Sequence, residues 1–413
     1  MNRDMTLPTE ARRLCLNSST HEAAARFEQQ GIDADRLENL LHTPPTEREK
    51  ARTELVELHD AWNRSTDMVV HVPEQRTAQP HGLLIALHGV GGTGEKVALH
   101  LQQLADTCGA ILLAPTAKRP VLDSNNLDLA GIRGREFSEA RWTYDPGDFP
   151  LQALAWGRKN LNIDVDRCGL VGTSMGAIAV WNITSRYWDR WSMAAPINGA
   201  PSMWEIFGPD RVVRKLLRNL TNVPLCAVHG QQDRQIPAAL DKEAVDYLRS
   251  IGHPEVSFVG VAQGEHNLST MDLQRGQPQF ERIAELYRQA RRPQWPSKLR
   301  HFASSGDSGR AHWLALEGIT QGKIGSFKAC VSDRAKIDLS VTNAARTRVF
   351  LSSRLVDPGQ VLITLNDATR VVNFKPTLLD TVKTYVDAGA DPALMAQMVV
   401  ELDVPEIPEC EDK

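Results

Sequence analysis

The sequence predicts an α/β fold with a doubly wound, mostly parallel sheet, preceded by a helical segment and followed by a smaller β-rich domain. Three observations support this division of the 413 residues. Residues 1–65 show helical spacing of apolar side chains, residues 66–292 alternate short apolar runs with helical segments, and residues 297–405 contain short strand-like runs separated by turns. We therefore expect three parts, of which the middle one is the largest.

The first 65 residues contain three runs of helical periodicity, Glu22 to Gln29, Ala34 to Leu41 and Glu47 to Trp62. A Pro-Pro pair separates the last run from the others. Thr46 with Glu49 approaches a capping box, a pattern that marks the start of a helix. We expect a helical packing segment that carries no chemistry of its own.

Continuous apolar runs in residues 66–292 are typical of strands that are buried on both faces of a parallel sheet. Helical segments such as Leu151 to Leu161 and Ala238 to Ile251 lie between these runs, and the alternation favours parallel pairing. The expected strands are Met68 to Val72, Leu83 to Leu87, Ala110 to Ala114, Cys168 to Val171, Pro224 to Val228 and Val256 to Val261.

Pro293-Gln294-Trp295-Pro296 ends this alternation. Residues 297–405 then predict a smaller β-rich domain with one helix, Leu378 to Ala388, and with turn residues such as Asp357-Pro358-Gly359 between its strands. The expected strands are His312 to Gly318, Phe327 to Val331, Lys336 to Val341, Thr347 to Ser352, Val361 to Leu365, Arg370 to Phe374 and Met395 to Leu402.

The run Gly172-Thr173-Ser174-Met175-Gly176 fits the G-x-S-x-G pattern of a nucleophile elbow. It follows the strand that ends at Val171 and precedes a helical run, Ala177 to Arg186, as such an elbow requires. A sharp strand-to-helix turn exposes the serine oxygen, and glycines on both sides relieve the crowding. We therefore predict Ser174 as a nucleophile.

A serine hydroxyl needs a base, and the base needs an acid that orients it. Where the nucleophile sits on such an elbow, the acid and then the histidine follow it along the chain. Asp233 lies just past the strand Pro224 to Val228, and His266 lies just past the strand Val256 to Val261. Functional side chains of open α/β sheets gather at the carboxyl ends of strands, so we predict Asp233 as the acid and His266 as the base.

Other acidic and imidazole side chains in this region have plainer interpretations. Asp241 and Asp246 fall on the following helix, where we expect solvated surface charges. His253 precedes its strand and therefore lies at the opposite end of the sheet, and His229 is expected to be a structural hydrogen-bonding residue of its loop.

The strand Leu83 to Leu87 ends in the glycine-rich run His88-Gly89-Val90-Gly91-Gly92. Acyl transfer needs two backbone N–H groups that point at the developing oxyanion. The residue after the nucleophile supplies one of them, and a turn after an earlier strand supplies the other. The backbone N–H groups of Met175 and Val90 are therefore the predicted oxyanion hole.

The same glycine-rich stretch also satisfies the G-x-G-x-x-G pattern of dinucleotide-binding proteins. Such a site wants an acidic residue at the end of the next strand, which here ends in Leu113-Ala114-Pro115-Thr116. A phosphate loop is disfavoured too, because Glu95 stands where its lysine should be and Val97 where its serine or threonine should be. These departures argue against nucleotide binding.

Residues 66–292 resemble α/β-hydrolase esterases of the dienelactone hydrolase, polyhydroxybutyrate depolymerase and predicted-peptidase type. The resemblance covers a little over half of the chain. It rests on His88-Gly89-Val90-Gly91-Gly92, Asn162-Ile163-Asp164-Val165-Asp166-Arg167, Gly172-Thr173-Ser174-Met175-Gly176, His229-Gly230-Gln231-Gln232-Asp233 with Pro237, and Glu265-His266.

The resemblance implies a Ser-Asp-His hydrolase that acts on an ester or, less often, on a peptide bond, without a cofactor. Ala177 replaces the second glycine that usually follows the elbow, and the cysteine-nucleophile branch of the group does not apply because position 174 is serine. Residues 297–405 resemble an accessory domain attached to some bacterial members.

Our first hypothesis is therefore a carboxylic-ester hydrolase that forms an acyl-enzyme and acts on a small-molecule or polymer-linked ester. A serine peptidase with the same triad and a non-catalytic binding protein are the alternatives. Trp142, Tyr144 and Trp204 lie in loops that could line a substrate pocket, although ordinary core packing explains them as well.

The bulk composition is that of an ordinary globular protein, with 42% hydrophobic and 24% charged residues and a net charge of -4. No basic surplus indicates nucleic acid, and no apolar stretch reaches membrane-spanning length. The N-terminus lacks the apolar region of a signal peptide, which favours the cytoplasm. The six scattered cysteines are expected to be buried free thiols.

Overall fold

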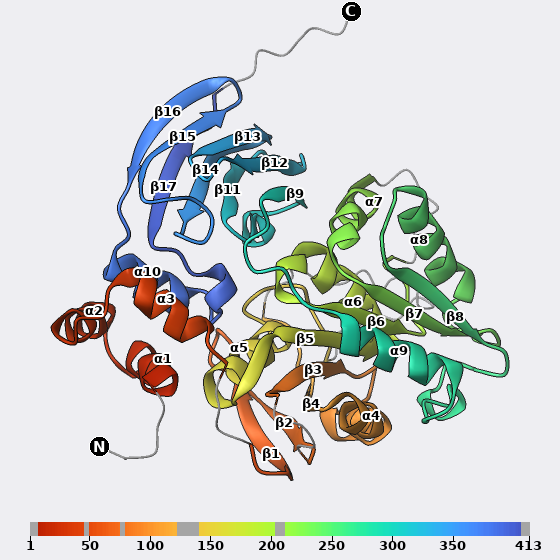
Figure 1. Cartoon of the computed structure of the whole chain (residues 1–413). Helices are drawn as coiled ribbons and strands as arrows, with labels where there is room; N and C mark the ends of the chain where they lie inside the picture. The colour runs from red at the N-terminus through yellow and green to blue at the C-terminus, as the bar shows by residue number, and fades with distance from the viewer. Residues whose placement is uncertain (1–6, 45–48, 75–78, 122–139, 203–210, 406–413) are drawn as a thin grey trace, which may run out of the picture. The chain divides into compact units, whose positions relative to one another are not determined.

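The chain forms two compact units in a computed structural model that describes residues 7–44, 49–74, 79–121, 140–202 and 211–405 (Figure 1). The central unit is Pro44–Arg292. The terminal unit combines Met1–Thr43 with Pro293–Lys413, so the two ends of the chain fold together.

An eight-stranded sheet with the strand order β1-β2-β4-β3-β5-β6-β7-β8 forms the centre of the central unit (Figure 1). The strands from β4 to β8 in this order pair in parallel, whereas β2 pairs antiparallel with both β1 and β4. The expected α/β fold with a mostly parallel sheet is thereby confirmed. The strands are β1 Arg52–His59, β2 Ser65–Val72, β3 His81–Leu87, β4 Ala110–Pro115, β5 Ile163–Thr173, β6 Met193–Ile197, β7 Leu225–Gly230 and β8 Val256–Val261.

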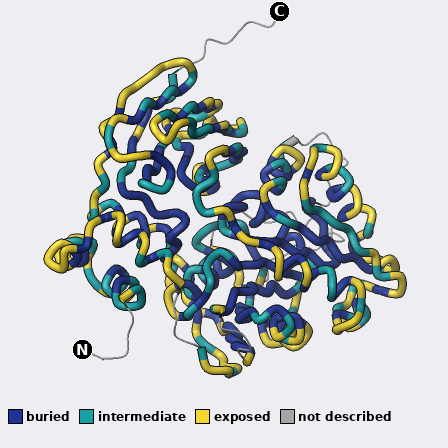
Figure 2. Tube along the Cα trace, in the orientation of Figure 1, coloured by how far each residue is buried: buried dark blue, intermediate teal, exposed yellow. Residues whose placement is uncertain are grey.

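Helices cover both faces of this sheet, and its strands β3, β4, β6 and β7 are buried over their whole length (Figure 2). Leu84 of β3 packs with Leu101 and Phe280, which belong to α4 and α9. Its neighbour Leu83 faces the other way and touches Gly157 of α5, because successive side chains of a strand alternate between the faces. The helices described in this unit are α4 Gly94–Cys108, α5 Phe149–Asn160, α6 Met175–Arg186, α7 Arg211–Leu216, α8 Ala238–Ser250 and α9 Pro278–Gln289.

The helix expected over Glu47 to Trp62 is wrong, because Arg52–His59 is the edge strand β1. This strand pairs with β2 in the register Arg52↔Val72 to His59↔Ser65. A turn joins the two strands, in which Asp60 accepts hydrogen bonds from the backbone N–H groups of Trp62 and Arg64. Pairing with β2 thus overrides a weak helical periodicity, and residues 44–65 belong to the central unit rather than to an N-terminal helical segment.

The terminal unit contains two sheets, with the strand orders β10-β11-β14-β17 and β16-β15-β13-β12-β9. Pairing within both is antiparallel apart from β13 with β15. Every strand expected in residues 297–405 is present, and β9 and β10 are additional. The strands are β9 Lys298–Ala303, β10 Arg310–Ala311, β11 Leu314–Ile319, β12 Gly325–Ser332, β13 Lys336–Thr342, β14 Ala344–Leu351, β15 Gly359–Leu365, β16 Ala368–Phe374 and β17 Met398–Asp403.

The N-terminal helices α1 Leu7–Asn17, α2 Thr20–Gln29 and α3 Ala34–His42 pack against α10 Leu378–Asp387 of the same unit. Phe27 and Leu37 from the first part of the chain share one apolar cluster with Val382 and Tyr385 from the last part. This cluster explains why residues 1–43 fold with the C-terminal region.

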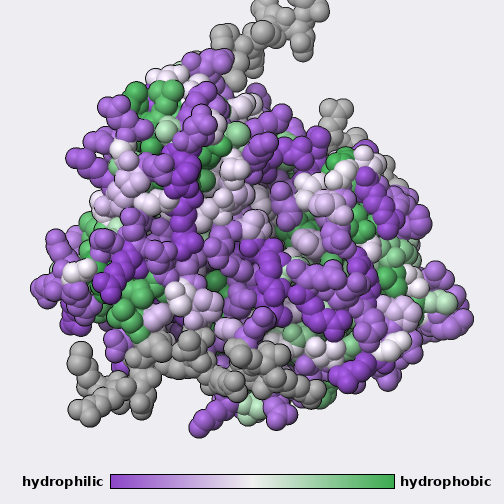
Figure 3. Space-filling model, viewed as in Figure 1, coloured by the Kyte–Doolittle hydropathy of each residue, from purple (hydrophilic) through white to green (hydrophobic). Residues whose placement is uncertain are grey.

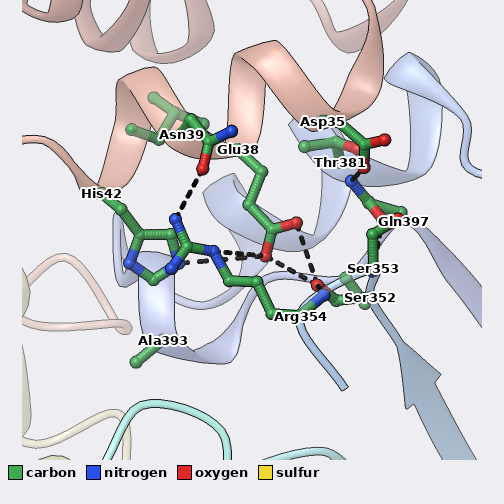
Figure 4. Close-up of polar contacts among 12 residues, drawn as sticks. Asp35, Glu38, Asn39, His42, Ser352, Ser353, Arg354, Thr381, Ala393 and Gln397 are labelled. Atoms are coloured by element: carbon green, nitrogen blue, oxygen red, sulfur yellow. Dashed lines mark hydrogen bonds and ion pairs between the residues drawn. The ribbon is translucent and has the colours of Figure 1, made fainter. Parts of the chain in front are cut away.

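A buried polar cluster also joins α3 to the segment that follows β14 (Figure 4). Glu38 is 2% exposed and accepts hydrogen bonds from Ser352 Oγ at 2.8 and 2.9 Å. Arg354 Nε lies 3.6 Å from Glu38, and its Nη2 donates to Asn39 Oδ1 at 2.8 Å. Burial raises the pKa of Glu38 to about 7, although Ser352 and Arg354 act in the opposite direction.

Hydrophilic side chains cover most of the face seen in Figure 3. Among the described residues, no helix combines the length and the apolar character needed to cross a bilayer. None of the described cysteines forms a disulfide: Cys15, Cys108, Cys168 and Cys226 are buried, and Cys330 is half-buried.

Glu38→Gln should make the terminal unit less sensitive to pH. The folded state holds a proton on Glu38 that the unfolded chain releases near pH 4.5, so wild-type stability falls as the pH rises from 4.5 to about 7. The variant should escape a loss of up to about 3 kcal/mol over this range. Urea unfolding of both proteins at the two pH values measures the difference.

The exposed Glu28, on α2 of the same unit, offers the matched control Glu28→Gln. This variant should keep the wild-type dependence of stability on pH. Equal pH dependence in Glu38→Gln and wild type would contradict a titrating Glu38.

Candidate active site

Ser174 occupies a sharp turn between β5 and α6. Its backbone has φ 54 and ψ -120, a conformation that costs a non-glycine residue free energy unless its surroundings impose it. The Ser174 N–H donates to the carbonyl of Ile197 on β6 at 3.0 Å, which ties the turn to the sheet. The sharp strand-to-helix turn predicted at Ser174 is therefore present, and the nucleophile role of Ser174 stays a prediction.

Gly172 and Gly176 allow this turn to close. A Cβ atom on Gly172 would lie 2.4 Å from the Gly176 carbonyl oxygen, and one on Gly176 would lie 2.1 Å from the Leu87 carbonyl oxygen. Both contacts are with backbone atoms, which cannot move aside as a flexible side chain can. The elbow thus needs glycine at both positions.

The side chains predicted as nucleophile, base and acid form one hydrogen-bonded line. Ser174 Oγ lies 2.7 Å from His266 Nε2, and His266 Nδ1 lies 2.6 Å from Asp233 Oδ2. The His266 side chain is 12% exposed and that of Asp233 is 0% exposed. The three residues follow β5, β7 and β8. The carboxyl ends of these parallel strands meet at one edge of the sheet, which brings the three side chains together.

The environment of Asp233 favours its ionised form. Burial raises the pKa of Asp233, but hydrogen bonds from His229, His266 and the backbone N–H of Ile236 lower it more, so it lies well below the usual range. The backbone N–H of Gln235 also donates to Asp233 Oδ1, at 2.8 Å. An ionised Asp233 accepts the Nδ1 proton of His266 and leaves Nε2 free to accept a proton from Ser174.

The residues predicted for the oxyanion hole lie beside Ser174. A Cβ on Gly89, the residue before Val90, would be 3.1 Å from Ser174 Cβ, so this loop passes close to the serine. Within the described part of the chain, neither the Val90 nor the Met175 backbone N–H has an acceptor. The oxyanion-hole role of these two N–H groups stays a prediction.

His88 and Trp142 hold the loop that carries Val90. His88 Nε2 accepts the Ala117 backbone N–H at 2.9 Å, so its Nδ1 carries the proton and donates to the Gly89 carbonyl at 2.7 Å. Burial lowers the pKa of His88, which favours this neutral ring. Trp142 Nε1 donates to the His88 carbonyl at 2.8 Å.

The pocket role predicted for Trp142 needs correction, because this side chain is 0% exposed and packs beneath the loop instead of lining an open pocket. Tyr144 is half-buried, and the Arg186 guanidinium lies 3.7 Å from its ring centroid. Its pocket role stays a prediction. Trp204 lies outside the described residues.

Asn198 is a structural residue of the site that the sequence analysis missed. It follows β6 with φ 54 and is 1% exposed. Its Nδ2 donates to the Glu265 carbonyl at 2.9 Å, and its Oδ1 accepts the Gly230 backbone N–H at 2.8 Å. One side chain therefore joins the loops of His266 and Asp233. An asparagine directly after a strand was the available signal.

The expectation of a solvated Asp241 is wrong. Asp241 is 0% exposed and lies 2.8 Å from His229 Nδ1, while His229 Nε2 lies 3.3 Å from Asp233 Oδ2. Its position on α8 did not reveal that Trp181 of α6 donates a hydrogen bond to it. No group of three or more His, Cys, Asp or Glu side chains within the described ranges is placed to hold a metal ion.

Strand order, elbow and the chain order of serine, acid and histidine together make this an α/β-hydrolase arrangement. No protein-family model and no curated protein matches the chain.

Solved structures of serine hydrolases and esterases do resemble the chain. FphF, a fluorophosphonate-binding serine hydrolase from Staphylococcus aureus, is 16% identical over 58% of this chain and 99% of its own, with a TM-score of 0.43. The S-formylglutathione hydrolase FrmB of the same organism is 17% identical over 58% and 99%, with a TM-score of 0.40. The Pyrococcus furiosus esterase Pf2001 is 15% identical over 60% and 99%, with a TM-score of 0.41.

Asn198→Asp should loosen the loop of His266. Aspartate keeps the size of the side chain and tolerates positive φ, but it cannot donate to the Glu265 carbonyl. We expect the free energy of unfolding to fall by about 1–3 kcal/mol. Backbone amides of residues 262–270 should exchange faster, as measured by hydrogen–deuterium exchange.

Asn63→Asp is the matched control, because the exposed Asn63 also has a positive φ, of 61. It should change neither stability nor exchange in residues 262–270. Wild-type exchange there in Asn198→Asp would contradict the bracing role.

Proposed function

We propose that this protein is a serine hydrolase that cleaves carboxylic esters through an acyl-enzyme intermediate. The observation that carries the proposal is the hydrogen-bonded line from Ser174 through His266 to Asp233. Such a line is what a serine needs to become a nucleophile at neutral pH. The substrate is a small-molecule or polymer-linked ester.

In the first step, Ser174 Oγ attacks the ester carbonyl while His266 Nε2 takes its proton. The carbonyl oxygen becomes an oxyanion and accepts hydrogen bonds from the backbone N–H groups of Val90 and Met175. His266 then gives the proton to the leaving alkoxide, and the acyl group stays on Ser174. Asp233 stabilises the imidazolium in both directions without taking its proton.

In the second step, water attacks the acyl-enzyme with His266 as the base, and the carboxylic acid leaves. The strained backbone conformation of Ser174 favours this chemistry, because it fixes Ser174 Oγ against His266 before the substrate binds. No cofactor takes part in this scheme.

Two alternatives use the same unit differently. A serine peptidase would share both steps but expel an amine, and a non-catalytic binding protein would have no need of a complete hydrogen-bonded line. Turnover of 4-nitrophenyl acyl esters beside matched anilides separates ester from amide cleavage.

Ser174→Ala should abolish covalent labelling by a fluorophosphonate and reduce kcat on an activated ester on the order of a millionfold. The serine oxygen is the only atom removed, so the fold should be unchanged by circular dichroism. Peptide mass mapping of the labelled wild type should place the adduct on Ser174.

Ser269→Ala, at an exposed serine in the His266 loop, is the control and should label like the wild type. An adduct on another residue, or full activity in Ser174→Ala, would refute the assignment. Labelling without ester turnover and with anilide cleavage would favour the peptidase.

A further inference from the structure

A second imidazole–carboxylate pair lies directly behind Asp233. His229 lies on β7 and Asp241 lies on α8, and both side chains are 0% exposed. His229 Nδ1 lies 2.8 Å from Asp241 Oδ2. On the other side of the ring, His229 Nε2 lies 3.0 Å from the Ile236 carbonyl oxygen and 3.3 Å from Asp233 Oδ2. The pair thus extends the line of Ser174 and His266 into the core.

The contacts of His229 fix where its protons are. Nε2 faces two oxygens that can only accept, so it carries a hydrogen. Nδ1 faces a carboxylate, so one further proton lies between His229 and Asp241. Interactions with the accepting carboxylates of Asp233 and Asp241 outweigh the effect of burial and raise the pKa of His229 to about 10. At neutral pH the ring therefore donates through both nitrogens.

Asp241 is equipped to remain a carboxylate in the core. Trp181 Nε1 of α6 donates to its Oδ1 at 2.7 Å, and the Gly199 backbone N–H lies 3.4 Å from its Oδ2. Burial raises the pKa of Asp241, and these donors together with His229 oppose that effect. Removing one partner would leave a buried polar group without compensation.

The titratable groups that face His229 in the described part of the chain are Asp233, from the loop after β7, and Asp241, from α8. From α6, the side chain that reaches this pair is Trp181, which carries no charge. From the loop after β8, His266 contacts the same Asp233 oxygen that faces His229.

We propose that His229 and Asp241 are positioning residues, which hold Asp233 ionised and aimed at His266 by means of a buried, doubly donating imidazolium. This inference rests on the proposed function of Ser174. Asp233 Oδ1 accepts two backbone N–H groups, and the His229 ring, whose Nε2 is bonded to the Ile236 carbonyl, places its positive charge 3.3 Å from Asp233 Oδ2. A positive charge beside Asp233 also limits how strongly Asp233 attracts a proton onto His266.

Asp241→Asn tests the charge separately from the hydrogen bond. The amide must present its oxygen to the Trp181 N–H, which turns its NH₂ toward His229 Nδ1. His229 then accepts at Nδ1, stays neutral and keeps the hydrogen on Nε2. The variant therefore removes the charges of His229 and Asp241 together, of which the His229 cation lies nearer to Asp233, but leaves the Nε2 hydrogen that faces Asp233.

The readout is the rate of fluorophosphonate labelling at Ser174 as a function of pH, which needs no knowledge of the substrate. The acidic limb of this profile reports protonation of His266. In Asp241→Asn it should move upward by up to about one pH unit, because Asp233 is no longer shielded by a neighbouring cation. A merely structural role would lower the amount of folded protein without moving the limb.

Asp246→Asn is the matched control on the same helix, because the Asp246 side chain is 45% exposed and pairs with Lys242 and Arg249. Its profile should coincide with that of the wild type. Trp181→Phe is the second variant. Losing its N–H destabilises the ionised form of Asp241, which weakens the positive charge on His229. The acidic limb should therefore move in the same direction, but by less. It carries the test if Asp241→Asn does not fold.

An upward shift in Asp241→Asn or Trp181→Phe, absent from Asp246→Asn, would support the inference. A wild-type profile in folded Asp241→Asn and Trp181→Phe would overturn it and leave the proposed function intact. Absence of labelling at Ser174 in the wild type at every pH would instead overturn the proposed function, and the inference with it.

Discussion

The strained backbone of Ser174 is the constraint around which the central unit is organised. A non-glycine residue at φ 54 costs roughly 1–3 kcal/mol, so its surroundings must enforce it. The enforcement comes from backbone atoms: the Ile197 carbonyl holds the Ser174 N–H, and the elbow glycines let β5 and α6 approach within contact of Leu87. Because these partners belong to the central strands, the serine can move only if the middle of the sheet moves with it.

The edge of the sheet that carries Ser174 also has to hold buried charge. Asp233, Asp241 and His229 are all withdrawn from water, and each is compensated by hydrogen bonds that reach it from a different element. One carboxylate beside one imidazolium, with a second carboxylate behind it, keeps the net buried charge small while every donor has an acceptor. Asn198 serves the same end without charge, since it satisfies backbone groups of both loops. The site is therefore rigid for electrostatic reasons as well as through packing.

The sequence predicted those features that depend on short stretches of chain. Continuous apolar runs indicated the central strands, and one pentapeptide with its flanks indicated the elbow at Ser174. Features that depend on distant partners were not predicted. For example, β1 is a strand because β2 pairs with it, although its own sequence has helical periodicity. Asp241 is buried, and one of its partners is Trp181, sixty residues away in sequence. Trp142 was assigned to a pocket because its loop position was visible and its bond to the His88 carbonyl was not. The catalytic roles themselves remain predictions.

The terminal unit shows the same dependence at the scale of the whole chain. Its apolar cluster combines Phe27 and Leu37 with Val382 and Tyr385, and Glu38 bonds to Ser352 across 314 residues of sequence. Neither end of the chain can bury its apolar face alone, because helices α1 to α3 find their partner in α10. Local periodicity correctly indicated helices α2 and α3, yet it could not indicate that they complete a β-rich unit formed by the other end of the chain. Since loop closure over such a distance must come before these contacts form, this core can assemble only after the last helix is available.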